Sequence, residues 1–332
     1  MNVLEQGKIL VTGGAGFIGS ALVWALNQRG IEDILIVDYL GKGDKFKNLV
    51  PLCFDDYCEA DTFLTALERD PKRFEDIKTT FHLGACSSTT EHDCRYLIEN
   101  NYHYSQRIAH WALGKGIRLI YASSAATYGT GEQGMDDQDE YLARLRPLNM
   151  YAYSKHRFDC WLQRRGCLSQ AVGLKYFNVF GPNEYHKENM CSLVFKAFSQ
   201  IQETGQVSLF KSHHPDYRDG EQQRDFLYIK DAVAMTLHLA DTPQANGLFN
   251  LGSGQAHTWI ELVAPIFTAL KRPVNLTFIP MPSSLRTRYQ YYTCADLTRL
   301  RSTGYHNPPT PLAEAVTDYA QHYLLVDKCL GD

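Results

Sequence analysis

Short apolar runs alternate with stretches of helical periodicity through the first half of the chain. The apolar runs predict strands, and the stretches in which apolar residues recur every three or four positions predict helices. This alternation is typical of an α/β fold with a doubly wound parallel sheet. The predicted helices span residues 17–29, 59–69, 93–114 and 150–165. The predicted strands are Lys8–Thr12, Asp33–Asp38, Leu49–Phe54, Thr79–Leu83, Arg118–Ser123 and Ala171–Phe177.

The pattern becomes less regular after Phe180-Gly-Pro182, where a polar stretch runs from Lys211 to Gln223. We predict a parallel-sheet domain over residues 1–178, joined by 225–250, and a smaller α/β lobe over 179–224 and 251–332. The lobe should cover the carboxyl edge of the sheet, where ligands bind in such folds. Predicted elements of this half are helices near 189–203, 231–241, 258–270 and 311–325 and strands at Asp225–Ile229 and Gly247–Leu251.

Composition excludes several classes of protein. The 332 residues are 44% hydrophobic, which is enough for a substantial core. A net charge of -4 offers no basic surface for nucleic acid, and no apolar run is long enough to span a bilayer. The first eight residues contain an acid and lead into a predicted strand, unlike a signal peptide. Nine cysteines without a Cys-x-x-Cys pair fit a reducing compartment, so we expect a soluble cytoplasmic protein without a metal site.

A glycine-rich turn, Thr12-Gly-Gly-Ala-Gly-Phe-Ile-Gly19, connects the first predicted strand to the first predicted helix. Glycines in this spacing allow a tight turn, a close approach of the backbone to a pyrophosphate and close packing of helix against strand. The strand before the turn and the helix after it favour a dinucleotide-binding Rossmann domain over an incidental glycine turn. The expected cofactor contacts in this segment are Gly13, Gly16, Phe17, Ile18 and Gly19.

An acid closes the second predicted strand. Asp38 lies about 20 residues beyond the glycines, where a carboxylate would hold the ribose 2′-hydroxyl of NAD. Lys42 and Lys45 follow it, and either ammonium could instead accept the 2′-phosphate of NADP. Both lysines also suit an ordinary exposed loop. These residues therefore leave NAD and NADP open.

Tyr151-Ala-Tyr-Ser-Lys155 lies on a predicted helix, downstream of the strand that ends at Ser123. A spacing of four places Tyr151 and Lys155 on one helix face, so that the ammonium can lower the pKa of the phenol. Alone, such a pair is more often a surface pair, but the glycine turn upstream favours a hydride-transfer site. There one serine of the pair Ser123-Ser124 would position a substrate alcohol while Tyr151 exchanges its proton.

Four further segments carry a resemblance to a known family: His82-Leu-Gly-Ala-Cys-Ser-Ser-Thr-Thr-Glu91, Asn100-Asn-Tyr102, Ala122-Ser-Ser-Ala-Ala-Thr-Tyr-Gly129 and Tyr176-Phe-Asn-Val-Phe-Gly-Pro182. With the Tyr-Lys pair they resemble the extended short-chain dehydrogenases/reductases that act on nucleotide sugars, over nearly the whole chain. Within that family they are similar to the epimerases that invert C6 of an ADP-activated heptose. Ala125 and Ala126 stand where dehydratases of the family carry acids, which disfavours elimination of water.

The resemblance implies a second acid/base residue, Lys187, acting across the pocket from Tyr151, with Ser124 and Lys155 completing the catalytic set. It also implies tightly bound NADP, with NAD as the alternative, an ADP-heptose substrate and a homo-oligomer, reported in the family as a pentamer. Further implied cofactor contacts are Tyr39, Lys45, Leu83, Gly84, Ala85, Cys86, Ser87, Asn100, Tyr151, Lys155, Val179 and Lys187. Implied substrate contacts are Ser124, Asn178, Asn189, Lys196, Phe210, Arg224 and Tyr289.

Two other functions remain open from the residues. One is a different nucleotide-sugar epimerase or reductase, such as a UDP-hexose 4-epimerase, and the Tyr-Lys pair does not distinguish it. Lys187 and its loop favour the C6 epimerase, although a loop lysine can also hold a phosphate. The other is a non-catalytic Rossmann redox sensor, which would not need Ser124, Tyr151, Lys155 and Lys187 together.

Overall fold

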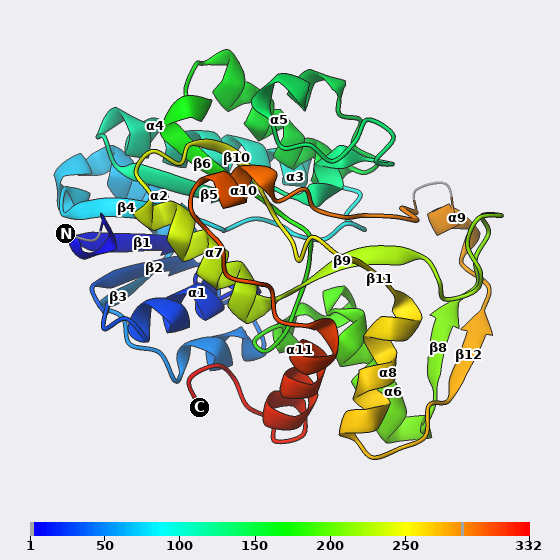
Figure 1. Cartoon of the computed structure of the whole chain (residues 1–332). Helices are drawn as coiled ribbons and strands as arrows, with labels where there is room; N and C mark the ends of the chain where they lie inside the picture. The colour runs from blue at the N-terminus through cyan, green and yellow to red at the C-terminus, as the bar shows by residue number, and fades with distance from the viewer. Residues whose placement is uncertain (1–2, 287–288) are drawn as a thin grey trace.

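A seven-stranded parallel sheet forms the centre of the computed structural model, which describes residues 3–286 and 289–332 (Figure 1). The strand order is β10-β6-β5-β4-β1-β2-β3, and every neighbouring pair is parallel. This sheet confirms the predicted doubly wound α/β fold. Its strands are β1 (Lys8–Thr12), β2 (Ile34–Asp38), β3 (Asp56–Glu59), β4 (Ile77–His82), β5 (Arg118–Ala122), β6 (Ala171–Tyr176) and β10 (Gly247–Leu251).

Helices cover both faces of this sheet. On one face Phe63 and Trp111 meet edge to face, with ring centroids 6.0 Å apart, and His110 and Trp161 do the same at 5.0 Å. Apolar residues on both sides of the sheet are fully buried and join in one core. The covering helices are α2 (Ala60–Arg69), α4 (Tyr104–Gly114) and α5 (Met150–Arg164) on that face, and α1 (Phe17–Asn27) and α7 (Ile229–Asp241), which contact each other, on the opposite face.

A smaller group of elements lies beyond the carboxyl ends of the central strands (Figure 1). It contains two small sheets and three longer helices. The boundaries that we predict between the two domains stay a prediction. One sheet pairs β7 (Asn178–Phe180), β9 (Gln223–Tyr228) and β11 (Ala256–Thr258), and the other pairs β8 (Val207–Phe210) with β12 (Leu276–Ile279). The helices are α6 (Leu193–Thr204), α8 (Trp259–Ala269) and α11 (Leu312–Tyr319).

The remaining helical segments are short, and none of the helices within the described residues is long and apolar enough to cross a membrane. Three are α3 (Cys94–Leu97), α9 (Ser283–Arg286) and α10 (Thr298–Ser302), and π-helical turns span Ile98–His103 and Ala320–Leu324. Turns of 3-10 helix span Val3–Glu5, Asp44–Leu49, Pro71–Phe74, Ala125–Tyr128, Asp139–Arg144, Leu168–Gln170 and Tyr185–Met190.

The predicted strand Leu49–Phe54 is wrong. A 3-10 turn ends at Leu49, and the strand β3 comes later, at Asp56–Glu59. Pro51 removes a backbone donor from the predicted strand, and Val50 is 71% exposed. Because β3 is a short edge strand with exposed acids at both ends, it carries no apolar signal.

Arg118 ties the start of β5 to the end of α7. Its guanidinium donates to the carbonyl oxygens of Leu239 at 2.9 Å, Thr242 at 2.9 Å and Ala245 at 2.8 Å. It also reaches the carbonyl of Ala240 at 3.2 Å. The last carbonyls of a helix have no partner within the helix, so one side chain satisfies several of them.

We therefore expect Arg118→Met to lower the free energy of unfolding by about 2–4 kcal/mol, because several hydrogen bonds to a charged donor are lost at once. The matched control is Arg107→Met, which removes an exposed ion pair to Glu68 and should cost about 1 kcal/mol or less. Denaturant unfolding of both variants measures the difference. Equal losses would contradict a special role for Arg118.

Candidate functional site

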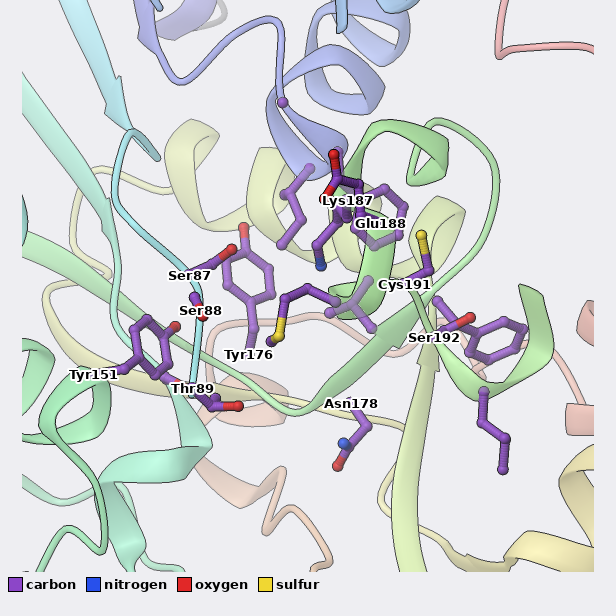
Figure 2. A pocket seen from close by; sticks show the side chains of 18 of the residues that line it. Ser87, Ser88, Thr89, Tyr151, Tyr176, Asn178, Lys187, Glu188, Cys191 and Ser192 are labelled. Atoms are coloured by element: carbon purple, nitrogen blue, oxygen red, sulfur yellow. The ribbon is translucent and has the colours of Figure 1, made fainter. Parts of the chain in front are cut away.

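A pocket of about 1340 Å³ opens at the carboxyl edge of the central sheet. Its walls come from the turn after β1, the segment after β4, the end of β5, the start of α5 and the loop around Lys187. Figure 2 shows that side chains from the segment after β4, from the start of α5 and from the loop around Lys187 face one space. The predicted residues that line it are Gly13, Gly16, Phe17, Ile18, Gly19, Asp38, Lys45, Leu83, Gly84, Ala85, Cys86, Ser87, Ser124, Tyr151, Lys155, Asn178, Val179, Lys187, Lys196, Phe210 and Tyr289.

The structure excludes a side chain at the glycines of the first turn to different degrees. Gly13 has φ +72°, and a Cβ there would lie 2.6 Å from the backbone nitrogen of Gly84. A Cβ at Gly19 would overlap the carbonyl oxygen of Gly13. Gly16 lines the pocket, and within 4 Å its Cβ would meet only the Gly13 oxygen, at 3.1 Å. Gly13 and Gly19 are therefore required by packing, whereas a Cβ at Gly16 would make a single tight contact, with the Gly13 oxygen.

Gly16 is also the N-cap residue of α1, and no side chain caps that helix. The first backbone N–H groups of a helix have no partner within it, and together with the helix dipole they attract phosphate. A missing Cβ beside free N–H groups fits the pyrophosphate of a dinucleotide.

Asp38 is already engaged on both carboxylate oxygens. One oxygen accepts a hydrogen bond from the backbone nitrogen of Ala15 at 2.9 Å, and the other from Tyr39 at 2.7 Å and from the Lys45 ammonium at 2.6 Å. Asp38 thus braces the glycine turn and is paired with a cation. Lys45 lies beside the carboxylate expected to select the ribose.

Ser124, Tyr151 and Lys155 meet at one wall of the pocket. Burial raises the pKa of the Tyr151 phenol, and a hydrogen bond with Ser124 opposes that rise. The Lys155 ammonium donates to the carbonyl oxygen of Ala122 at 2.8 Å, and burial lowers its pKa to about 8, with Asp159 opposing. The expected lowering of the phenol pKa by Lys155 is not found here: burial raises the pKa of Tyr151, and the group that opposes the rise is Ser124.

Lys187 enters the same pocket from a different wall (Figure 2). It belongs to the 3-10 turn Tyr185–Met190, and its ammonium lies 5.3 Å from the centre of the Phe17 ring. Burial lowers the pKa of Lys187 from its usual value. The pocket therefore holds a partly buried phenol and a partly buried amine on separate walls.

Arg224 lies behind the pocket wall. Its guanidinium is 5.0 Å from the centre of the Tyr289 ring and 5.8 Å from that of Trp259, and both rings line the pocket. Arg224 is 5% exposed, and burial lowers its pKa. Among the described residues it makes no ion pair within 4.0 Å, so its charge is compensated by aromatic rings.

Three other predicted contacts also lie off the pocket wall. Tyr39 is exposed and its hydroxyl donates to Asp61. Asn189 is exposed, and its carbonyl accepts from the Lys196 ammonium at 2.6 Å. Asn100 donates to the carbonyl of its own helix at Tyr96, at 2.9 Å. The roles proposed for these residues stay predictions.

The neighbouring Asn101 is a residue that sequence reasoning missed. It is fully buried, and its amide pairs with both the backbone nitrogen and the carbonyl of Cys86, at 2.8 and 2.9 Å. It also donates to Ser154 on α5 at 2.9 Å. Asn101 thus holds the pocket segment after β4. The motif Asn100-Asn-Tyr102 was the available signal, but the π-helical turn Ile98–His103 changes which side chain faces inward.

In residues 3–286 and 289–332, no cluster of three His, Cys, Asp or Glu side chains could hold a metal ion.

The NAD dependent epimerase/dehydratase family matches residues 9–252. The chain is 48% identical to the ADP-L-glycero-D-manno-heptose-6-epimerase of Nitratidesulfovibrio vulgaris, over 95% of this chain and 97% of the relative. It is 43% identical to the enzyme of the same name from Fusobacterium nucleatum, over 95% and 98%.

This chain is also similar in fold and in sequence to a solved structure. The Helicobacter pylori ADP-L-glycero-D-manno-heptose-6-epimerase superposes with a TM-score of 0.79 at 29% identity and covers 97% of each chain. The chain therefore resembles this solved enzyme in fold over nearly its whole length.

The two glycines predict a separation of stability from binding. Gly16→Ala should leave the thermal unfolding midpoint nearly unchanged but weaken nicotinamide dinucleotide binding by about 10-fold or more, because its methyl group enters the pocket wall. Gly19→Ala should cost about 1–3 kcal/mol of folding free energy, because its Cβ overlaps backbone. Bound dinucleotide per chain and thermal unfolding measure the two effects. Unchanged binding in Gly16→Ala would contradict the assignment of the turn.

Proposed function

The chain belongs to the NAD-dependent epimerase/dehydratase family, and from that premise we propose that it inverts C6 of the heptose in ADP-D-glycero-D-manno-heptose. The product is ADP-L-glycero-D-manno-heptose, a precursor of the lipopolysaccharide core. The observation that carries the proposal is the placement of Tyr151 and Lys187 on separate walls of one pocket. Assembly as a homo-oligomer and a cytoplasmic location stay predictions.

Inversion through a 6-keto sugar needs proton transfer at the sugar oxygen from two directions. A bound nicotinamide ring supplies a reversible hydride acceptor, so the reaction has no net redox change. Tyr151 serves the alcohol of one epimer, and Lys187 serves the alcohol of the other after the keto sugar has turned. Ser124 holds the same oxygen, and Lys155 supports the end of β5 through Ala122.

The pKa shifts suit this division. A raised pKa keeps the Tyr151 phenol protonated near neutral pH. A lowered pKa brings the Lys187 amine closer to its neutral form. One group can therefore give a proton while the other can take one, and the two exchange states in each turnover.

For the cofactor we propose NADP, with NAD as the alternative. The support is Lys45, whose ammonium pairs with Asp38 at 2.6 Å and also donates to the carbonyl of Tyr39 at 3.0 Å. This cation offsets the charge that Asp38 would present to a 2′-phosphate, and its own donors suit that phosphate.

The purified protein should interconvert the two ADP-heptose epimers without added cofactor, since hydride leaves and returns within one turnover. Tyr151→Phe and Lys187→Met should each lower kcat by about 10²–10⁴-fold, because each removes one proton-transfer group. Epimer ratios followed by NMR measure both. Failure of folded, dinucleotide-loaded protein to interconvert the epimers would refute the function, and full turnover in Lys187→Met would refute the two-group scheme.

Lys45→Ala should weaken NADP binding by about 10-fold relative to NAD, because a charge-assisted bond to the 2′-phosphate is lost. Lys42→Ala is the matched control, since Lys42 is an exposed lysine of the same loop and should leave the ratio unchanged. Titration of dinucleotide-free protein with each cofactor gives the ratio. An equal loss for NAD and NADP in Lys45→Ala would contradict the preference.

A further inference from the structure

Glu184 is a buried acid immediately before the turn that carries Lys187, and its residue exposure is 0%. Its carboxylate accepts hydrogen bonds from the backbone nitrogen of Ser192 at 2.5 Å and from the Ser192 hydroxyl at 2.7 Å. Tyr319 donates at 3.1 Å and the backbone nitrogen of Gly181 at 3.5 Å. Burial raises the pKa of the Glu184 carboxyl, and the bonds from Ser192 and Tyr319 and the charge of Lys187 oppose that rise. Two of the donors are N–H groups, which can only donate, so they favour the ionised carboxylate.

These bonds connect the two ends of the Lys187 turn. Gly181 precedes the turn and Ser192 follows it, and the Ser192 hydroxyl also caps α6 by accepting from Phe195 at 3.3 Å. The backbone nitrogen of Lys187 donates to the Glu184 carbonyl at 2.9 Å. One buried side chain therefore fixes where the Lys187 segment starts and ends.

The turn needs such a constraint because its backbone is strained. Glu188, directly after Lys187, has φ 48° and ψ -120°, a conformation that a non-glycine residue adopts only when its surroundings enforce it. Glu184 supplies part of that enforcement through bonds on both sides of the strained residue.

Charge links the two residues as well. Burial lowers the pKa of Lys187, Glu184 and Cys191 oppose the lowering, and Lys196 adds to it. His186 lies within range of the Lys187 charge. Tyr185, Tyr319 and Cys191 lie within range of the Glu184 charge. Within the described residues Lys187 makes no ion pair within 4.0 Å, so Glu184 acts on it at longer range.

We propose that Glu184 is a positioning residue for Lys187. Its carboxylate holds both ends of the Lys187 turn and places a buried negative charge near the amine. Glu184 does not line the pocket, so it acts through Lys187 and not on the substrate. This inference rests on the proposed role of Lys187 as an acid/base group at C6.

The principal test is Glu184→Gln, which keeps the shape of the side chain but removes its charge. We expect kcat to fall by about 10-fold, less than the loss caused by removing Lys187, while KM and bound dinucleotide stay unchanged. The pH midpoint for labelling of the Lys187 amine by acetic anhydride, read by peptide mass spectrometry, should move to lower pH. The direction follows because losing a nearby negative charge makes an ammonium easier to deprotonate.

Tyr319→Phe is the matched control, since it removes one donor to the carboxylate but keeps the charge. Its labelling midpoint should stay at the wild-type pH. In a Lys187→Met background, Glu184→Gln should cause no further loss of kcat, because residues that act through one group are not additive. An unchanged midpoint in Glu184→Gln, or fully additive losses of kcat, would overturn the proposal.

The labelling experiment does not depend on catalysis. If Lys187→Met retains full activity, the two-group scheme fails while the shift in midpoint still tests the link between Glu184 and Lys187. Should Glu184→Gln not fold, Ser192→Ala removes the hydroxyl bond and keeps the charge. It should lower kcat without lowering the midpoint, and wild-type kcat in that variant would overturn the positioning role.

Discussion

Contact between two backbone turns at the centre of the sheet sets the shape of the pocket. The chain crosses from β3 to β4, so that β1 and β4 are neighbours and their carboxyl ends diverge into different turns. Gly13 and Gly84 approach so closely that a Cβ at Gly13 would lie 2.6 Å from the Gly84 nitrogen. Thr12 holds this junction, since its hydroxyl bonds both Gly84 at 3.1 Å and His82 at 2.7 Å. Burial lowers the pKa of His82 to about 3, so a neutral ring joins Thr12 to Ser105.

Around this junction the fold buries the cations of Lys155 and Arg224 and partly buries that of Lys187. Burial lowers the pKa of Lys155, Lys187 and Arg224, which means that folding destabilises the protonated, charged form of each side chain. Asp159 and Glu184 offset part of this effect for the two lysines. A dinucleotide and a nucleotide sugar both carry diphosphates, so binding them offsets more of it. Desolvation of these cations therefore favours anionic ligands, and it brings the two lysine amines closer to their neutral form.

Local patterns predicted the elements that carry a strong local signal and missed those that do not. The bounds of β1 and β10 agree with the predicted runs because both strands are mainly apolar and almost wholly buried. The polar edge strand β3 was misplaced because its pairing with β2 depends on contacts distant in sequence. Local patterns also did not show that Asn101, and not Asn100, contacts the segment after β4, since a π-helical turn sets which amide faces inward. Tyr151 and Lys187 could be proposed from motifs, but the pocket that both line comes from tertiary structure.

The last residues of the chain complete the Lys187 wall from far away in sequence. Leu330 donates from its backbone nitrogen to the Asn183 side chain at 2.8 Å, and the Tyr185 hydroxyl donates to the carbonyl of Lys328 at 2.6 Å. Asn183 has φ 77° and also donates to Ser20 on α1 at 2.9 Å, so it joins the carboxyl end of the chain to α1. Because the segment before Lys187 is held by both, the position of the amine depends on the whole chain being folded. A proton-transfer group on an irregular turn can be placed accurately only when regular elements fix that turn from several sides.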